Sequence, residues 1–313
     1  ITTGDQNVFI GYQAGDATTT AGFNIGIGYN ALGANILGGR SVAIGNAALE
    51  VQNYSTATDA YNVAIGHGAG EAVTTGVNNT LIGGLAGDAL TTSSNATAVG
   101  YLALSADTAG YNVAVGAFAG SGITSGTRNT AVGPAALQVA TTGADNTAFG
   151  ANALKAATTS ASNTAVGSNA LAVNTTGTNN VAVGYGSLDA NTTGGQGVAI
   201  GREALSANTT ASDNTAVGYQ AMLDNTTGNS CVAVGFSALA NNTTAHGSVA
   251  VGRDALYASL TGANNTAVGY SALAANTTGH SQTAVGYNAL RNQTTGTNNT
   301  AVGFAALQAS TTA

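Results

Sequence analysis

The chain is poor in the residues from which most functional sites are built. Only 6% of its 313 residues are charged, against about 25% in typical soluble domains. It has no tryptophan, one proline and one cysteine. Because Cys231 stands alone, no disulfide can form within the chain. Of the three histidines, His67 falls at a different phase of the repeat described below from His246 and His280, which are two repeats apart, so we expect no shared metal site.

The charge balance and the lack of long apolar runs argue against a nucleic-acid-binding protein and a membrane-spanning segment. Six basic residues stand against 13 acidic ones, a net charge of −7, and there is no basic stripe of the kind that neutralises nucleic-acid phosphates. No run of 18 apolar residues is present, so we expect no membrane insertion by this segment. Disorder is not expected either, because 44% of the residues are hydrophobic.

What the chain has instead is one short unit repeated from end to end. Asn299–Leu307 reads NTAVGFAAL, Asn265–Leu273 reads NTAVGYSAL, and Asn7–Gly15 is a divergent copy. The fifth residue of the unit is always glycine, and successive glycines are 17 residues apart except for one step of 21 and one of 16. The 18 glycines are Gly11, Gly28, Gly45, Gly66, Gly83, Gly100, Gly116, Gly133, Gly150, Gly167, Gly184, Gly201, Gly218, Gly235, Gly252, Gly269, Gly286 and Gly303. A fixed period of this kind indicates a solenoid.

Each unit is numbered here from 1 to 17, starting at its asparagine. Position 2 is Thr, Val or Ile, position 4 is Val, Ile or Phe, and position 3 is alanine in 15 copies. This alternation predicts a short strand with the branched side chains of positions 2 and 4 inside and the small residues of positions 3 and 5 on the other face. Alanine and leucine at positions 8 and 9 indicate a second short strand with both residues buried. The Asn-Thr-Thr-Gly sequence at positions 12 to 15 indicates a turn.

The units predict an all-β solenoid of about 18 coils with a 17-residue period, in which each residue lies over the one 17 positions earlier. A helical interpretation fails because the Ala-Leu stretches are too short and are closed by glycine and turn residues. Asparagines in register are expected to form hydrogen-bonded ladders along the stack. We interpret residues 1–313 as a single continuous array, cut from a longer fibre, with a solvent-facing turn insertion at residues 50–60.

The bare alanine and glycine face of the predicted strand suggests association between chains. Each coil buries few apolar side chains, so further burial against another copy is expected to stabilise the array. The small residues at positions 3 and 5 would allow close approach of backbones. For an elongated stack, a homotrimer about the long axis is a natural arrangement.

The repeats resemble two related families. The Asn-Thr-Ala-Val-Gly pattern is similar to the head repeats of trimeric autotransporter adhesins of the YadA type, whose own unit is shorter. The longer unit, with its Asn-Thr-Thr-Gly turn, resembles repeats of phage tail-fibre proteins. The resemblance implies a left-handed parallel β-roll, a parallel homotrimer, and a location outside the cell, at the cell surface or on a virion.

The predicted function is that of a structural shaft in such a fibre, with attachment to a host glycan or protein made by another region. We expect no enzymatic activity and no cofactor, because no carboxylate pair, phosphate loop or nucleophile recurs in a fixed phase. Aromatic residues recur at position 6, and Tyr270, Tyr287 and Phe304 are the candidate surface ladder. The alternatives are a glycan-binding solenoid that uses this ladder and an ice-binding solenoid. The latter is disfavoured at this stage because the position-2 threonines are expected to be buried.

Overall fold

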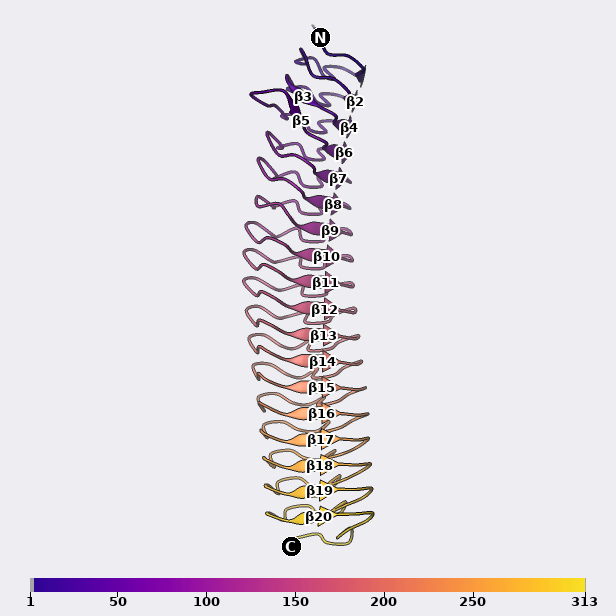
Figure 1. The fold of residues 1–313 in the computed structure, drawn as a ribbon, viewed down its shortest axis with the longest axis vertical. Coiled ribbons are helices and arrows are strands. Elements are labelled where there is room, and N and C mark those ends of the chain that lie inside the picture. The colour runs from indigo at the N-terminus through magenta and orange to yellow at the C-terminus, as the bar shows by residue number, and fades with distance from the viewer. Residues whose placement is uncertain (1–2, 313) are drawn as a thin grey trace. The chain divides into compact units, whose positions relative to one another are not determined.

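The computed structural model describes residues 3–312, and the chain divides into two units, residues 1–160 and residues 161–313. Each unit is a parallel β-solenoid built from the 17-residue repeat (Figure 1). The chain holds about 17 turns, one fewer than the count of repeat copies suggested. Neither the hand of the coils nor an assembly of chains is established by the fold of one chain, and both remain expectations.

The main strands occupy positions 2 to 4 of the repeat, as predicted. In the first unit the strands are β1 (Val8–Ile10), β2 (Ile25–Ile27), β3 (Gly38–Gly39), β4 (Val42–Ile44), β5 (Thr58–Asp59), β6 (Val63–Ile65), β7 (Thr80–Ile82), β8 (Thr97–Val99), β9 (Val113–Val115), β10 (Thr130–Val132) and β11 (Thr147–Phe149). In the second they are β12 (Thr164–Val166), β13 (Val181–Val183), β14 (Val198–Ile200), β15 (Thr215–Val217), β16 (Val232–Val234), β17 (Val249–Val251), β18 (Thr266–Val268), β19 (Thr283–Val285) and β20 (Thr300–Val302).

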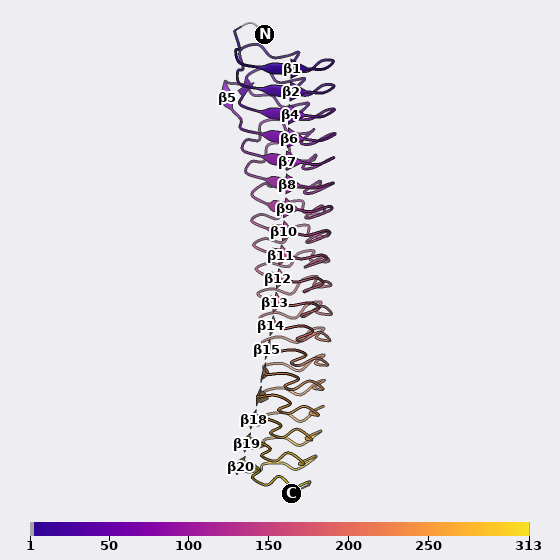
Figure 2. The same cartoon turned by 90° about the vertical axis from the view of Figure 1, so that its right-hand side faces the viewer.

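The strands of each unit pair in parallel and in register with the next copy. Thr266 pairs with Thr283, Ala267 with Ala284 and Val268 with Val285, each 17 residues on. The 21-residue step is absorbed outside the sheet, because Val42 still pairs with Val63. This register confirms that one repeat is one coil and not a hairpin. Figure 2 shows the strands within a unit in single file, with the turns of each coil beside them.

The second strand predicted at positions 8 and 9 is wrong, because this segment is a tight turn. Residues at positions 7 and 9 have positive φ, as in Ser271 (51°) and Leu273 (53°), and so does position 17, as in Asn264 (59°). Adjacent residues of a strand point to opposite faces, whereas this conformation lets Ala272 and Leu273 both reach the core, where both are fully buried. The sequence carried a signal for it, since no Val, Ile or Thr occurs at positions 7, 9 or 17, where positive φ would strain a branched side chain.

The predicted orientation of the main strand is also wrong. From β2 onward, the middle residue of every three-residue strand is buried, while its neighbours at positions 2 and 4 are half-buried or exposed. The coil is narrow, and its interior is filled by alanines at positions 3 and 8 and leucine at position 9. Ala267 is therefore inside and Val268 is not. The alanine row cannot form the contact between chains that the sequence suggested.

The four glycines at position 9 are explained by packing within the core. A Cβ atom on Gly87 would lie 2.6 Å from Leu81 Cδ2 and 2.8 Å from Leu90 Cδ1. On Gly120 it would lie 2.9 Å from Leu104 Cδ2 and 3.1 Å from Ile123 Cδ1. A larger apolar residue at position 3 or 12 thus fills the space that leucine occupies elsewhere. The interior of these coils is therefore filled differently from that of the coils with leucine at position 9.

Rows of asparagine bind the turns of successive coils, as predicted: position 1 supplies one in both units, and position 12 supplies a second in the second unit. At position 1, Asn163 Oδ1 accepts from the Asn180 backbone N–H at 2.9 Å, while Asn163 Nδ2 donates to the Gly177 carbonyl. At position 12, Asn191 Nδ2 donates to Asn174 Oδ1 at 2.9 Å and to the Gly194 carbonyl at 3.0 Å. Because buried amides are costly unless paired, these rows fix the register of the turns.

The insertion at residues 50–60 is more ordered than a solvent-facing turn. Tyr54 is only 7% exposed, and its hydroxyl donates to the Gly76 carbonyl at 2.7 Å. Burial raises the pKa of Tyr54 to about 12. Within the insertion, β5 pairs with β3 of the preceding coil, Gly38 opposite Thr58. The expectation that this segment faces solvent is therefore wrong for Tyr54, which anchors the insertion to the core.

Cys231 interrupts the position-1 asparagine row and offers a test of that row. Its thiol donates weakly to the Ala245 carbonyl at 3.4 Å, where asparagine would use its amide. We expect Cys231→Asn to restore the amide contacts and raise the free energy of unfolding by about 0.5–1.5 kcal/mol per hydrogen bond gained. Cys231→Ala, which has no polar atom, should lower it. Thermal melts of the three proteins test this, and a lower melting temperature for the asparagine variant would contradict it.

Candidate functional site

The outward face of the main sheet is the most regular surface of each unit. It consists of positions 2 and 4, where all 18 copies carry only Val, Ile, Thr or Phe. Exposure reaches 59% at Ile10, 56% at Phe149 and 69% at Val302. The strands are in register, so the side chains form two straight rows in each unit. We call these two rows the branched face.

A second surface feature is a column of side chains at position 6 of the second unit. The Tyr270 and Tyr287 rings stack with centroids 5.1 Å apart, and the Tyr287 and Phe304 rings at 5.2 Å. Tyr219 and Phe236 stack in the same way at 5.2 Å. The predicted ladder is thus part of a longer column, whose members are Tyr185, Arg202, Tyr219, Phe236, Arg253, Tyr270, Tyr287 and Phe304.

Arginines bridge the gaps between the rings of this position-6 column. The Arg253 guanidinium carbon lies 5.1 Å from the Phe236 centroid and 5.9 Å from that of Tyr270. Arg202 lies in the same way between Tyr185 and Tyr219. Each arginine also pairs with the acid that follows it, Arg202 with Glu203 at 3.0 Å and Arg253 with Asp254 at 3.2 Å. Both arginines therefore belong to the position-6 column.

The geometry of the column limits what it can bind. Tyr287 has a parallel ring on each side, so both of its π faces are occupied and only its edge faces water. Sugars bind aromatic residues through an open ring face. The predicted sugar stripe therefore has little support in the middle of the column, and stacking between coils accounts for it better.

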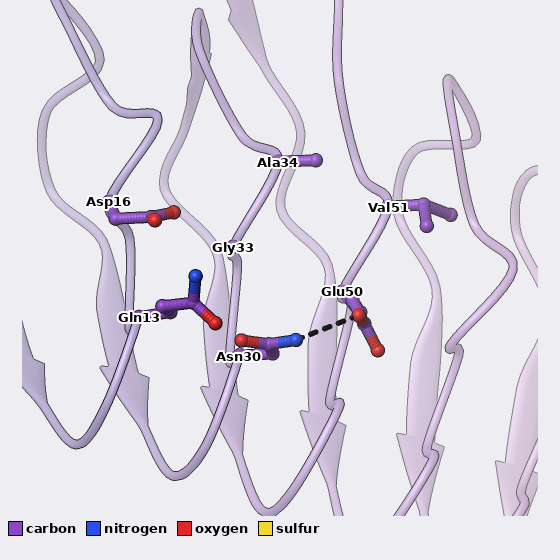
Figure 3. A pocket seen from close by; sticks show the side chains of 7 residues that line it. All are labelled: Gln13, Asp16, Asn30, Gly33, Ala34, Glu50 and Val51. Carbon is purple, nitrogen blue, oxygen red and sulfur yellow. Dashed lines mark hydrogen bonds between the residues drawn. The ribbon is translucent and has the colours of Figure 1, made fainter.

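Two pockets lie at positions 7 and 10, where the turn follows the strand. Figure 3 shows the one in the first unit, lined by Gln13, Asp16, Asn30 and Glu50 among others, with Asn30 Nδ2 donating to Glu50 Oε1 at 2.9 Å. The corresponding pocket of the second unit has a volume of about 460 Å³. It is lined by Gln220, Phe236, Asp254, Tyr257, Ser271 and Arg291 among others.

Cys231 and the Asn-Thr-Thr turns offer little chemistry. Cys231 is fully buried, and burial raises the pKa of its thiol, which disfavours the reactive thiolate. Asn174, in the Asn-Thr-Thr glycan-acceptor pattern, is buried with its amide bonded to Gly177. Within residues 3–312, no group of three His, Cys, Asp or Glu side chains could hold a metal, and no helix could cross a membrane.

Comparison with models of known families and with curated proteins gave no match. The resemblance to fibre repeats therefore rests on the repeat motif alone.

The column predicts a specific stability effect at Tyr287. Tyr287→Ala removes two stacked contacts, each worth about 0.5–1.5 kcal/mol, and should lower the free energy of unfolding accordingly. Tyr287→Phe keeps both stacks and is the matched control. Chemical denaturation of the three proteins measures the difference. Equal stability of the alanine and phenylalanine variants would show that the rings do not support each other.

Proposed function

We propose that the chain is the structural shaft of a fibre outside the cell or on a virion, assembled from parallel copies that associate through the branched face. The observation that carries the proposal is the composition of that face: positions 2 and 4 hold no charged residue in any copy. A straight, uncharged, β-branched surface exposed to water is a site of association unless it is covered. A second copy presents an identical face in the same register.

The parallel homotrimer comes from the resemblance to adhesin heads and tail fibres, and the fold is compatible with it. The main strands of each unit keep one register, so a contact made at one coil can be repeated at the next. The rows at positions 2 and 4 replace the alanine row as the proposed contact. In this proposal, another region of the fibre binds the host through a surface glycan or protein. The shaft itself performs no catalysis.

Val268→Asp tests the contact directly. Val268 is half-buried in the single chain, so the fold of one chain should tolerate the aspartate, whereas an unpaired charge inside an interface is costly. We expect the wild-type chain to have three times the monomer mass in analytical ultracentrifugation and the variant to dissociate. Thr278→Asp, on an exposed turn, is the control and should remain associated. A monomeric wild-type chain, or an intact trimer of Val268→Asp, would refute the proposed contact.

Ice binding is the second candidate, and one observation now favours it. The position-2 threonines, expected to be buried, lie on the branched face, and Thr266, Thr283 and Thr300 are consecutive there. The threonine hydroxyl and methyl groups repeat about every 4.8 Å across strands, and the side chain at position 4 of each strand adds methyl groups roughly 6.7 Å along it. A rigid array of this kind can order a layer of water if no other chain covers it.

Thermal hysteresis separates the two candidates. A shaft whose branched faces cover one another should not depress the freezing point below the melting point of ice. An uncovered array should do so, and Thr283→Asp should abolish the effect while Thr278→Asp leaves it unchanged. Hysteresis in the associated wild-type protein would favour the second candidate over the first.

A further inference from the structure

We infer that the pocket beside Tyr257 binds a saccharide unit that carries a carboxylate. This inference does not depend on the shaft function, because it concerns side chains at positions 7 and 10 and not the branched face. Its starting point is position 10, where the side chain changes from copy to copy. Here Tyr257 and Arg291 place a large aromatic and a cation in that row, with only Ala274 between them.

Tyr257 offers the open ring face that the position-6 column lacks. It is 43% exposed, and its neighbours in the position-10 row, one coil before and one after, are Ala240 and Ala274. Among residues 3–312, it takes part in none of the ring stacks or cation–π contacts that hold the column together. The apolar face of a pyranose ring can therefore pack on it.

Arg291 supplies the charge. It lies two coils from Tyr257, a separation of roughly 10 Å along the stack, and Ala274 leaves the space between them open. Arg202 and Arg253 are each paired with an acid, whereas Arg291 forms no ion pair within the described part of the chain. Asp254, the acid of the pocket, is engaged by Arg253. A guanidinium without a partner is suited to bind a carboxylate through two parallel hydrogen bonds.

The other lining groups fit the hydroxyls of a sugar. Gln220 donates its amide to Glu203 at 2.8 Å, which leaves its carbonyl oxygen to accept, and Ser237 and Ser271 add hydroxyl groups. The volume of about 460 Å³ lies in the range of small-ligand sites. A ring with one apolar face, several hydroxyls and a carboxylate matches all three kinds of contact.

The pocket of the first unit provides a contrast. It occupies the same repeat positions, but Asp16 and Glu50 line it, and no aromatic or basic residue does. It would repel an acidic sugar. The binding site is thus assigned to the side chains at Tyr257 and Arg291 and not to the repeat backbone, which both pockets share.

Saturation-transfer NMR on the full chain with sodium glucuronate, glucose and sodium benzoate tests this. We expect glucuronate to bind, and glucose and benzoate, which lack the carboxylate and the hydroxyls respectively, to bind more weakly. Tyr257→Ala should abolish the signal and Tyr257→Phe retain it. Arg291→Ala should weaken glucuronate binding about tenfold, as expected for a lost hydrogen bond to a charged group, and leave glucose unchanged.

Tyr185→Ala, at the far end of the position-6 column, is the control and should bind as the wild type does. Melting curves establish that each variant is folded. The inference is overturned if the wild-type chain gives no glucuronate signal, or if folded Tyr257→Ala gives the wild-type signal. Unchanged glucuronate affinity in Arg291→Ala would overturn the assignment of the carboxylate.

Discussion

Within each unit, every coil lies one strand spacing from the next, and this close approach is the constraint on which the rest of the structure depends. Gly269 shows how tight the approach is, because a Cβ there would lie 2.5 Å from the Gly286 carbonyl oxygen. Stacking at this distance places each side chain against its own counterpart. Alanine, leucine and asparagine tolerate such like-on-like contact, because they pack or hydrogen-bond with themselves.

The same constraint accounts for the scarcity of charge. A charged residue repeated at one position would face its like at about 4.8 Å in every coil, and like charges at that distance repel. Glu50, Glu71 and Asp88, at position 10 of three successive copies, are an exception, whereas most of the arginines are placed to avoid it. Arg128 and Asp145, 17 residues apart, form an ion pair at 2.6 Å between successive coils. Arg202 and Arg253 instead lie between aromatic rings.

The period predicted the architecture, the register and the asparagine rows, since all three follow from spacing alone. It did not predict which face of the strand is inside. The alternation of residue types places Ala267 and Val268 on opposite faces of the strand. It does not tell which face points inward, because this depends on how wide the interior of the coil is. The turn at positions 7 to 9 was missed because consecutive buried residues suggested a strand. The absence of branched residues there was the better guide to backbone conformation.

The candidate sites, too, could be predicted from the sequence only in part. The recurrence of aromatic residues at position 6 predicted the column at Tyr270, Tyr287 and Phe304. It did not predict that arginines belong to the column, because they occupy the same position but are not aromatic. The pocket at Tyr257 and Arg291 lies at position 10, where the residue type changes from copy to copy and gives no recurring motif. The fold brings the position-7 and position-10 side chains together.

The confinement of bonding to adjacent coils has a consequence for how such a chain can change over evolutionary time. Within each unit a coil exchanges backbone hydrogen bonds with the coil before and the coil after it, so its stability depends on nearest neighbours. Recombination between two identical repeats adds or removes a whole coil and leaves every remaining row in register. The number of coils can therefore change by single genetic events that leave the remaining coils able to fold, whereas the buried rows at positions 3 and 8 remain almost entirely alanine.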